Sequence, residues 1–323
     1  MATFRQKFEA ALSRRAIVVT HDPTEECDAL LVIAGTRHLL PLLRARQRHV
    51  RVVQRLDGIN WVHRRRNTGA RHFLRAEYGN LILSLIRARI ATHILYQSEF
   101  TRRWWEGWYG KPGRPSSVVH NGVDLDEFQP DGSGQPPSEH RRLLVVEGSL
   151  GGGYDMGLDN AVQLAHILQH KHGLPMELLV VGKIEAGHQA AVRASASVPI
   201  IWAGIVPRQR IPEIDRSAHL LFSADLNAAC PNAVVEALAC GLPVAAFDTG
   251  ALNELVLGDS GRLVPYGADP WRLEMPDVPA LAAAAAEILR ERSRFSRAAR
   301  EHAVQALGVE KMVDGYLKVL LEA

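Results

Sequence analysis

Residues 230–256 read CPNAVVEALACGLPVAAFDTGALNELV, and this stretch decides the fold prediction. Pro231 suits the start of a helix, because its missing N–H would have no partner there. Gly241 can end that helix in a left-handed conformation, and the Leu-Pro pair after it keeps the helix from resuming. Residues 244–247 are continuously apolar and too short for a surface helix, which favours a buried parallel strand. The stretch therefore predicts helix, strand and a second helix start in close succession.

The two helix starts, near Pro231 and near Ala251, aim free backbone N–H groups beyond the strand ends, where anions are favoured. Asn232 and the turn Thr249–Gly250 accompany them. Glu236 lies on the first helix, and a carboxylate beside an anion site is explained if it accepts hydrogen bonds from a ribose diol. The pattern indicates a nucleotide. The alternative for Glu236 is an ordinary solvated helix position.

This stretch resembles the signature region of family 4 of the retaining glycosyltransferases, GT-B enzymes that take sugars from nucleotide-sugar donors. Further matches fall in the right order at 120–124 (HNGVD) with Phe128 and Pro130, at 202–207 (WAGIVP) and at 261–265 (GRLVP). The resemblance covers residues 116–265 well and the first 115 residues poorly. It implies two doubly wound, Rossmann-like α/β domains facing a central cleft, with the donor on the second domain and the acceptor on the first.

Length and periodicity agree with two α/β domains, because 323 residues exceed the usual size of one core. Strands are expected at 17–20, 30–34, 50–53, 93–97, 118–120, 143–147, 177–181, 200–203, 220–223 and 244–247. Helices are expected at 37–47, 73–92, 158–170, 211–217, 280–290 and 311–321. Residues 129–140 are rich in Pro, Gly and Ser and are expected to form a linker. The predicted domains are then 1–128 on the acceptor side and 141–308 on the donor side, and the resemblance implies a helix over 309–323 that crosses back to the first.

A glycine-rich segment, 148–157 (GSLGGGYDMG), lies between a predicted strand and a predicted helix. Glycines at such a place let backbone N–H groups approach a phosphate, so the triple glycine is expected to hold the donor diphosphate. Lys183 or Arg208 would supply positive charge. A dinucleotide-binding site is disfavoured, because the next strand ends in Gly182-Lys183 and not in an acidic residue. A turn without a ligand is the other reading of this segment, whose triple glycine comprises Gly151, Gly152 and Gly153.

Three positions depart from the family pattern. Ser149 and Met156 stand where relatives carry an Arg and a Lys on the donor diphosphate. Ala228 stands where relatives carry the first carboxylate of an E-x7-E motif that ends at Glu236. In one interpretation the enzyme is active and Asp225 replaces the lost carboxylate. In the other, the chain is a non-catalytic GT-B subunit for nucleotide-sugar binding or assembly.

On the acceptor side, Arg55-Leu56-Asp57-Gly58 follows a predicted strand. Asp57 could orient or deprotonate an acceptor hydroxyl, with Arg55 tuning it or touching a phosphate. A turn cap is the alternative for Asp57. The resemblance implies transfer with retention at the anomeric carbon. We expect no metal and no cofactor, because Asp124-Leu125-Asp126 lies in the family's domain-joining segment and the histidines show no ligand-like spacing.

Charge is split along the chain. Residues 1–130 carry 21 Lys and Arg against 12 Asp and Glu, a net of +9, and residues 131–323 carry 17 against 23, a net of −6. Phe4, Phe8 and Leu12 recur on one face of a basic amphipathic helix, which could dock on anionic lipids or pack on its own domain. The expected acceptor is anionic, lipid-linked or a small molecule. No nucleic-acid motif is present, so no nucleic acid is expected as partner.

Three cysteines, Cys27, Cys230 and Cys240, are too few and too scattered for a disulfide framework, which favours a reducing compartment. No apolar run reaches the roughly 18 residues that span a bilayer. A cytoplasmic protein is expected, with peripheral contact at the inner membrane face as an alternative.

Overall fold

The computed structural model describes residues 2–22, 25–150 and 155–321. The chain forms two compact units, Met1–Gly122 with Gly308–Ala323, and Val123–Leu307. Residues 123–140, which include the segment expected as a linker, are counted with the second unit. The last residues of the chain are counted with the first unit.

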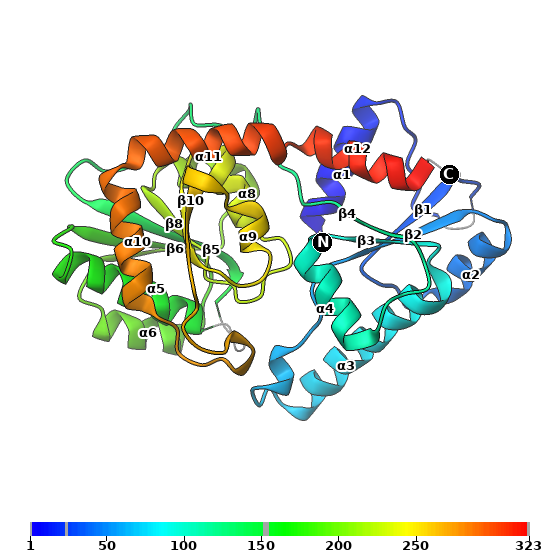
Figure 1. Ribbon diagram of the computed structural model, residues 1–323, viewed down its shortest axis with the longest axis horizontal. Coiled ribbons are helices and arrows are strands. Elements are labelled where there is room, and N and C mark those ends of the chain that lie inside the picture. The colour runs from blue at the N-terminus through cyan, green and yellow to red at the C-terminus, as the bar shows by residue number, and fades with distance from the viewer. Residues whose placement is uncertain (1, 23–24, 151–154, 322–323) are drawn as a thin grey trace. The chain divides into compact units, whose positions relative to one another are not determined.

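The first unit is built on a parallel sheet with strand order β1-β2-β3-β4 (Figure 1). Its strands are β1 (Ala29–Ile33), β2 (Arg51–Leu56), β3 (His93–Tyr96) and β4 (Ser116–Val118). Its helices are α1 (Ala2–Arg14), α2 (Leu39–Gln47), α3 (Ala70–Leu85), α4 (Glu99–Tyr109) and α12 (Val309–Leu321). Successive side chains of β2 point to opposite faces, so Val52 packs in one core with α2, and Val53 in another with α1 and α12.

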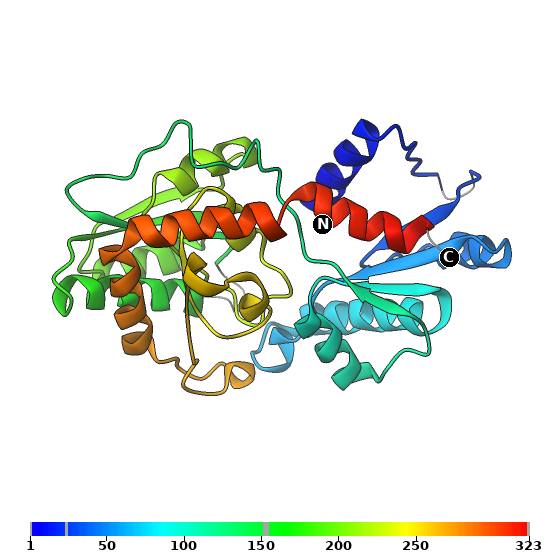
Figure 2. The ribbon, with the colours of Figure 1, turned by 45° about the horizontal axis from the view of Figure 1, so that its top comes forward.

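Helix α12 lies beside α1 on one face of this sheet (Figure 2). The rings of Phe4 and Phe8 each lie 5.1 Å from the ring of Tyr316 on α12. Outside this contact, Arg15 binds Glu310 through Nη2 at 2.6 Å. The apolar face of α1 is therefore buried in its own unit, and the idea that this face docks on lipids was wrong.

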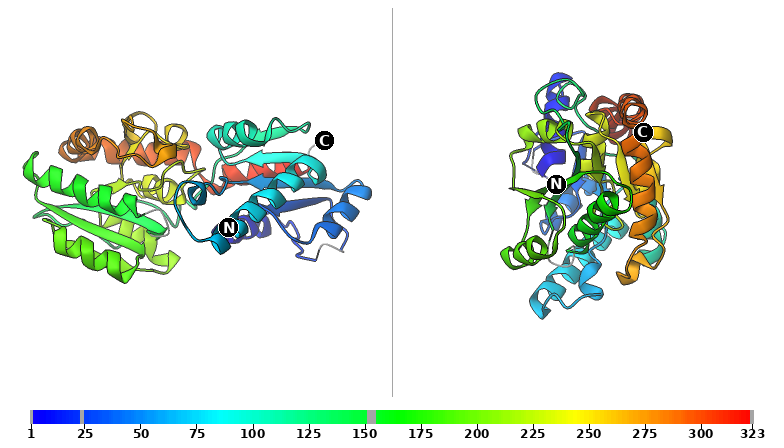
Figure 3. Two further views of the ribbon diagram at one scale, coloured as in Figure 1. Left: turned by 90° about the horizontal axis from the view of Figure 1, so that it is seen from below. Right: turned by 90° about the vertical axis from the view of Figure 1, so that its left-hand side faces the viewer.

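Two predicted elements of the first unit differ in the structure. Residues 17–20 form no strand, and Val18 is 93% exposed. The helix expected over 73–92 begins earlier and ends at Leu85, where a π-helical turn, Ile86–Ile90, continues it. In that turn the buried Arg87 donates from Nε to Tyr96 Oη at 2.9 Å. Figure 3 shows α3, in light blue, along its length from below.

The second unit holds a parallel sheet with strand order β10-β9-β8-β5-β6-β7. Its strands are β5 (Arg141–Ser149), β6 (Met176–Lys183), β7 (Ile200–Gly204), β8 (Leu220–Phe222), β9 (Val244–Phe247) and β10 (Gly261–Val264). Its helices are α5 (Met156–His170), α6 (Ala186–Ser195), α7 (Ile211–Arg216), α8 (Asn232–Ala239), α9 (Leu252–Leu255), α10 (Val278–Arg290) and α11 (Arg292–Ala306).

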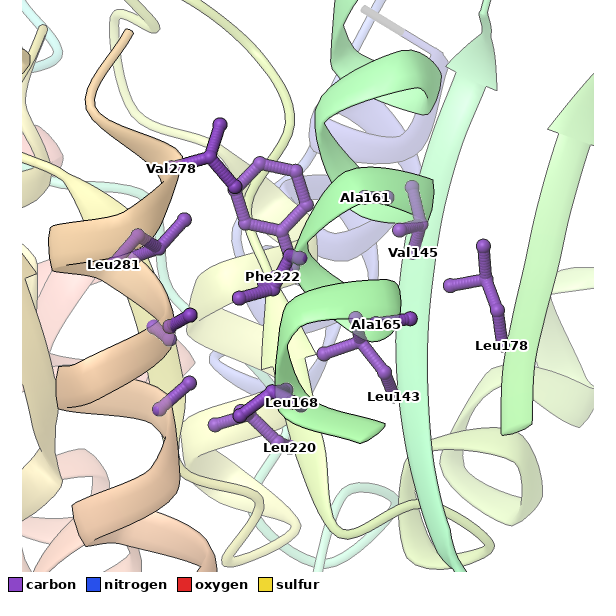
Figure 4. Packing of buried hydrophobic residues seen from close by; sticks show 14 of the residues in the cluster. Leu143, Val145, Ala161, Ala165, Leu168, Leu178, Leu220, Phe222, Val278 and Leu281 are labelled. Carbon is purple, nitrogen blue, oxygen red and sulfur yellow. The ribbon is translucent and has the colours of Figure 1, made fainter. Parts of the chain in front are cut away.

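Both faces of this second sheet are covered by helices. On one face Leu143, Val145 and Phe222 pack against α5 and α10, as Figure 4 shows. On the other, the intervening residues Leu144 and Leu221 pack against α7, α8 and α11. Strands buried on both faces explain why the sequence reads there as continuous apolar runs. Each unit is thus an α/β unit on a parallel sheet, as predicted.

Candidate functional site

The second sheet has one topological switch point. From the central strand β5 the chain moves outward to β6 and β7, then crosses to β8 on the other side of β5 and continues to β9 and β10. Ligands of doubly wound sheets bind outside the carboxyl ends of the strands at such a point. The residues near the ends of β5 and β8 are therefore the first to consider. Glu147 lies near the end of β5, and Asp225 lies three residues after the end of β8.

A bulge sets the direction of Glu147. Val146 pairs with Val181 of β6 and Ser149 pairs with Lys183, so two residues, Glu147 and Gly148, oppose one residue, Gly182. Gly182 has φ 142°, and a Cβ there would lie 2.1 Å from the Glu147 carbonyl oxygen, so only glycine allows this approach. Bulges of this kind turn a side chain away from the ladder and often lie beside active sites.

Glu147 and Asp225 both line a pocket of about 170 Å³ at this edge. Its other lining residues are Ser149, Leu150 and Ala224. Burial raises the pKa of Asp225 to about 6. Burial and, to a smaller extent, the charge of Asp225 raise the pKa of Glu147 well above its ordinary value, while the Asp225 backbone N–H donates to its carboxylate. Both carboxyl groups therefore hold their protons more tightly than exposed carboxyl groups do, and a protonated carboxyl group beside an ionised one offers both a donor and an acceptor.

The corner around Glu236 forms as the sequence predicts. Pro231 caps α8 with extended backbone, Asn232 is its first residue, and Gly241 follows the helix with φ 70°. Glu236 is only 6% exposed. Arg208 donates from Nη1 to Glu236 Oε1 at 2.9 Å, and its guanidinium lies 5.2 Å from the centre of the Phe128 ring.

A second buried acidic residue lies close to Glu236. Asp215 of α7 is 1% exposed, and burial, together with the charge of Glu236, raises its pKa well above the ordinary value. The neighbouring Cys240 thiol donates a hydrogen bond to it. The Asp215 carboxyl group therefore holds its proton more tightly than an exposed carboxyl group does.

The turn after β9 approaches Ala228 closely. Gly250 has φ 63°, and a Cβ there would lie 2.5 Å from the Ala228 nitrogen. The Ala251 N–H donates to the Ala228 oxygen at 2.9 Å, so it is not available to an anion, and that part of the prediction was wrong. The role predicted for this amide fails because the loop that ends β8 folds back onto it.

Two buried polar groups in the same loops have no hydrogen-bond partner within the described ranges. They are the Asn227 amide nitrogen and the Thr249 hydroxyl. Asn227 also has φ 55°, an uncommon conformation outside glycine that is found at functional sites. Thr249 was predicted from the sequence as a site residue. Asn227 was not, and its only signal in the sequence is its place beside Ala228.

The remaining donor-side candidates are distributed around this edge. Lys183 ends β6 with an exposed side chain, and its carbonyl accepts from the Leu150 N–H at 2.9 Å. Gly151, Gly152 and Gly153 lie outside the described residues. At the start of α5, Gly157 lies against Ala224, so close that a Cβ would be 2.8 Å from the Ala224 Cβ. The described ends of this segment therefore lie at the pocket of Glu147 and Asp225, since Ser149 and Leu150 line it and Gly157 contacts Ala224, which also lines it.

In the first unit, Arg55 is structural. It is buried, donates from Nε to Tyr316 Oη at 2.8 Å and from Nη2 to Asn121 Oδ1 at 2.8 Å, and lies 4.0 Å over the Phe4 ring. Arg55 therefore fastens α1 and α12 to β2. These contacts take up its guanidinium, which disfavours the predicted phosphate contact, whereas its charge does lower the pKa of the Asp57 carboxyl group.

Asp57 follows β2 in a half-buried position. Burial raises the pKa of its carboxyl group, and Arg55 offsets part of that rise. Its carbonyl accepts from Trp105 Nε1 at 2.7 Å, and Gly58 lies so close to Trp104 that a Cβ would be 2.8 Å from the ring. The aromatic side of α4 thus fixes the loop that carries Asp57. Asp57 lies in the first unit, whereas the donor-side candidates lie in the second.

The described residues contain neither a candidate metal site nor a candidate membrane span. Within them, no group of three or more His, Cys, Asp or Glu residues could hold a metal ion. No helix in the described part of the chain is both long and apolar enough to cross a bilayer.

Comparison with known proteins finds one family model that matches part of the chain. Residues 141–291 match the family model described as Glycosyl transferases group 1, which confirms the resemblance seen in the sequence. A comparison with curated proteins finds no match.

Solved structures resemble the chain over almost its whole length. Sucrose-phosphate synthase from Thermosynechococcus elongatus is 17% identical, with a TM-score of 0.69, over 97% of this chain and 75% of that one. WaaG, a glycosyltransferase involved in lipopolysaccharide biosynthesis, is 13% identical, with a TM-score of 0.68, over 99% of this chain and 96% of that one. HepE from Anabaena, in complex with UDP and glucose, is 16% identical, with a TM-score of 0.61, over 98% of this chain and 81% of that one. These likenesses confirm the GT-B fold.

Proposed function

With a glycosyltransferase group 1 domain over residues 141–291 as the premise, we propose that this protein moves a sugar from a nucleotide-diphosphate-sugar donor to an acceptor. The transfer would retain the anomeric configuration and would need neither a metal ion nor a cofactor. The observation that carries the proposal is the corner around Glu236, a buried carboxylate on the helix that follows the switch point. HepE, which shares the fold, has been solved with UDP-glucose, so UDP and UDP-glucose are the first probes.

Glu236 would accept hydrogen bonds from the ribose diol. Arg208 donates to a carboxylate oxygen of Glu236, and it would hold the carboxylate in place while adding positive charge near the diphosphate. The first residues of α8, Pro231 and Asn232, would present the helix N-terminus to that diphosphate. Lys183, Thr249 and the triple glycine Gly151–Gly153 complete the proposed diphosphate contacts.

Glu147 and Asp225 would face the transferred sugar. Their pocket lies at the ends of the two strands that flank the switch point, and one shared proton lets the pair bind sugar hydroxyls both as donor and as acceptor. An ionised Asp225 would also stabilise positive charge on the sugar as the diphosphate leaves. Asp225 would in this way take over the task of the carboxylate missing at Ala228. Catalysis would depend on positioning and on charge stabilisation.

The first unit would supply the acceptor side. Asp57, with a raised pKa and a loop held by α4, is the candidate for orienting or deprotonating the acceptor hydroxyl. The unit carries 23 Lys and Arg against 12 Asp and Glu, a net of +11, which favours an anionic or lipid-linked acceptor and peripheral contact with a membrane.

A second candidate is a non-catalytic nucleotide-sugar-binding or assembly subunit. It is favoured by Ser149, Met156 and Ala228, which stand at positions where the family resemblance implies charged groups. The two candidates agree on donor binding and differ in turnover.

Calorimetry with nucleoside diphosphates and their sugars tests the donor site. We expect the wild-type protein to bind the nucleoside diphosphate of one particular base. Glu236→Gln should weaken that binding by about 1 to 3 kcal/mol, because the ribose loses a carboxylate acceptor. Glu177→Gln is the matched control, since Glu177 is also a shielded carboxylate bound by an arginine, Arg142, at 2.6 Å. No binding of any nucleoside diphosphate would refute the proposal, and equal losses in both variants would remove the ribose assignment.

A further inference from the structure

Helix α3 presents a row of large apolar side chains to solvent. Leu74, Tyr78, Leu81 and Leu85 are exposed by 68%, 47%, 61% and 39%. Their spacings of four, three and four residues place them on one face of the helix, in a row about 16 Å long. Large apolar side chains gathered on one face, and not scattered singly, mark an interaction surface.

The opposite face of α3 is fixed inside the first unit. Ala76, Asn80 and Leu83 are buried, and Asn80 Oδ1 accepts from the Asn60 N–H at 3.1 Å. The helix therefore cannot rotate to bury the outer row, which stays at the surface of the first unit. The view from below shows α3 along the whole length of this row (Figure 3).

Positive charge flanks the row. Arg71 and Arg75 are exposed on one shoulder of the same helix, and the Arg37 guanidinium lies 5.6 Å over the Tyr78 ring. The acidic residue on the other shoulder, Glu77, is already bound by Arg64 through two hydrogen bonds of 2.5 and 2.7 Å. The row therefore faces solvent beside arginine side chains, and the one carboxylate of α3 is paired with Arg64.

We propose that this outer face of α3 docks on an anionic lipid surface. Apolar side chains would enter the boundary between headgroups and acyl chains, while the arginines would contact the negative headgroups, as in interfacial amphipathic helices. The same face is poorly suited to a second copy of the chain, because pairing would bring the arginines of both copies together. The surface of a single row is also small compared with the roughly 800 Å² that each partner buries in a stable protein interface.

This inference does not depend on glycosyl transfer, and it replaces α1 with α3 as the docking element. Co-sedimentation with vesicles of phosphatidylcholine alone, and with vesicles containing phosphatidylglycerol, tests it. We expect binding to the anionic vesicles only. Arg71→Gln with Arg75→Gln should weaken that binding roughly thirtyfold, since each arginine near the surface contributes about one kcal/mol. Leu74→Gln with Leu81→Gln should weaken it at least about tenfold.

Ile205→Gln with Met275→Gln is the matched control, because these residues of the second unit are exposed by 76% and 67%. This control should bind vesicles like the wild type. All substitutions lie at exposed positions, and circular dichroism with thermal unfolding checks that each variant is folded. Absence of vesicle binding, binding that the α3 variants leave unchanged, or an α3-dependent dimer without vesicle binding would each overturn the proposal.

Discussion

The ionisation of Asp215, close to Glu236, affects the stability of the folded protein. Its pKa is raised in the folded protein, so the folded state holds a proton that the unfolded state releases above about pH 4. Stability gained through this group is therefore present at low pH and declines as the pH rises toward the raised pKa.

Asp215→Asn keeps the shape of the side chain and removes this proton linkage. We expect the variant to be more stable than the wild type at pH 8 by about 1 to 3 kcal/mol, and to show a weaker fall in stability between pH 5 and 8. Urea unfolding at several pH values measures this. Equal pH dependence in both proteins would show that Asp215 ionises normally.

Local residues of the site could be predicted from the sequence, and others could not. Glu236 and Gly241 belong to a helix with its own start and stop signals, so neighbours in the sequence were sufficient. Glu147 becomes a site residue only through a bulge that depends on Gly182 of another strand. The packing role of Arg55 could not be predicted, because its partner Tyr316 is 261 residues away and no local pattern reports that contact.

Among the elements, α1 shows that an amphipathic pattern predicts which face of a helix is buried but not which element covers that face. The spacing of Phe4, Phe8 and Leu12 predicted the apolar face correctly, and the structure covers it with α12. Residues 17–20 show the reverse case, since an apolar run there forms no strand. Five of the six strands of the second sheet were predicted, because buried strands read as continuous apolar runs, whereas β10 was not predicted as a strand.

The packing of α1 on α12 gives a prediction at this scale. Phe8 is 5% exposed and contacts Tyr316, so Phe8→Ala should reduce the free energy of unfolding by about 3 to 5 kcal/mol. Phe73→Ala, at a position 42% exposed on α3, is the control and should cost less than about 1 kcal/mol. Chemical denaturation compares the two. If Phe8→Ala weakened vesicle binding without lowering stability, α1 and not α3 would be the docking element.

At the scale of the whole molecule, the two units differ in charge as well as in their candidate sites. The first unit has a net charge of +11, and the second, with 15 Lys and Arg against 23 Asp and Glu, has a net charge of −8. An acidic unit that binds a nucleotide diphosphate must provide local donors, and α8, Lys183 and Arg208 are the candidates for them. The basic unit suits an anionic acceptor or surface.

Release of nucleoside diphosphate from the donor that binds most tightly, followed across pH, tests the central claim of sugar transfer. The account predicts turnover by the wild type that falls as the pH drops below about 6, where Asp225 takes up a proton. Asp225→Asn should bind the nucleoside diphosphate normally and lose turnover at every pH. A wild-type protein that binds the donor and releases no diphosphate above the uncatalysed rate would contradict the account and identify a binding subunit.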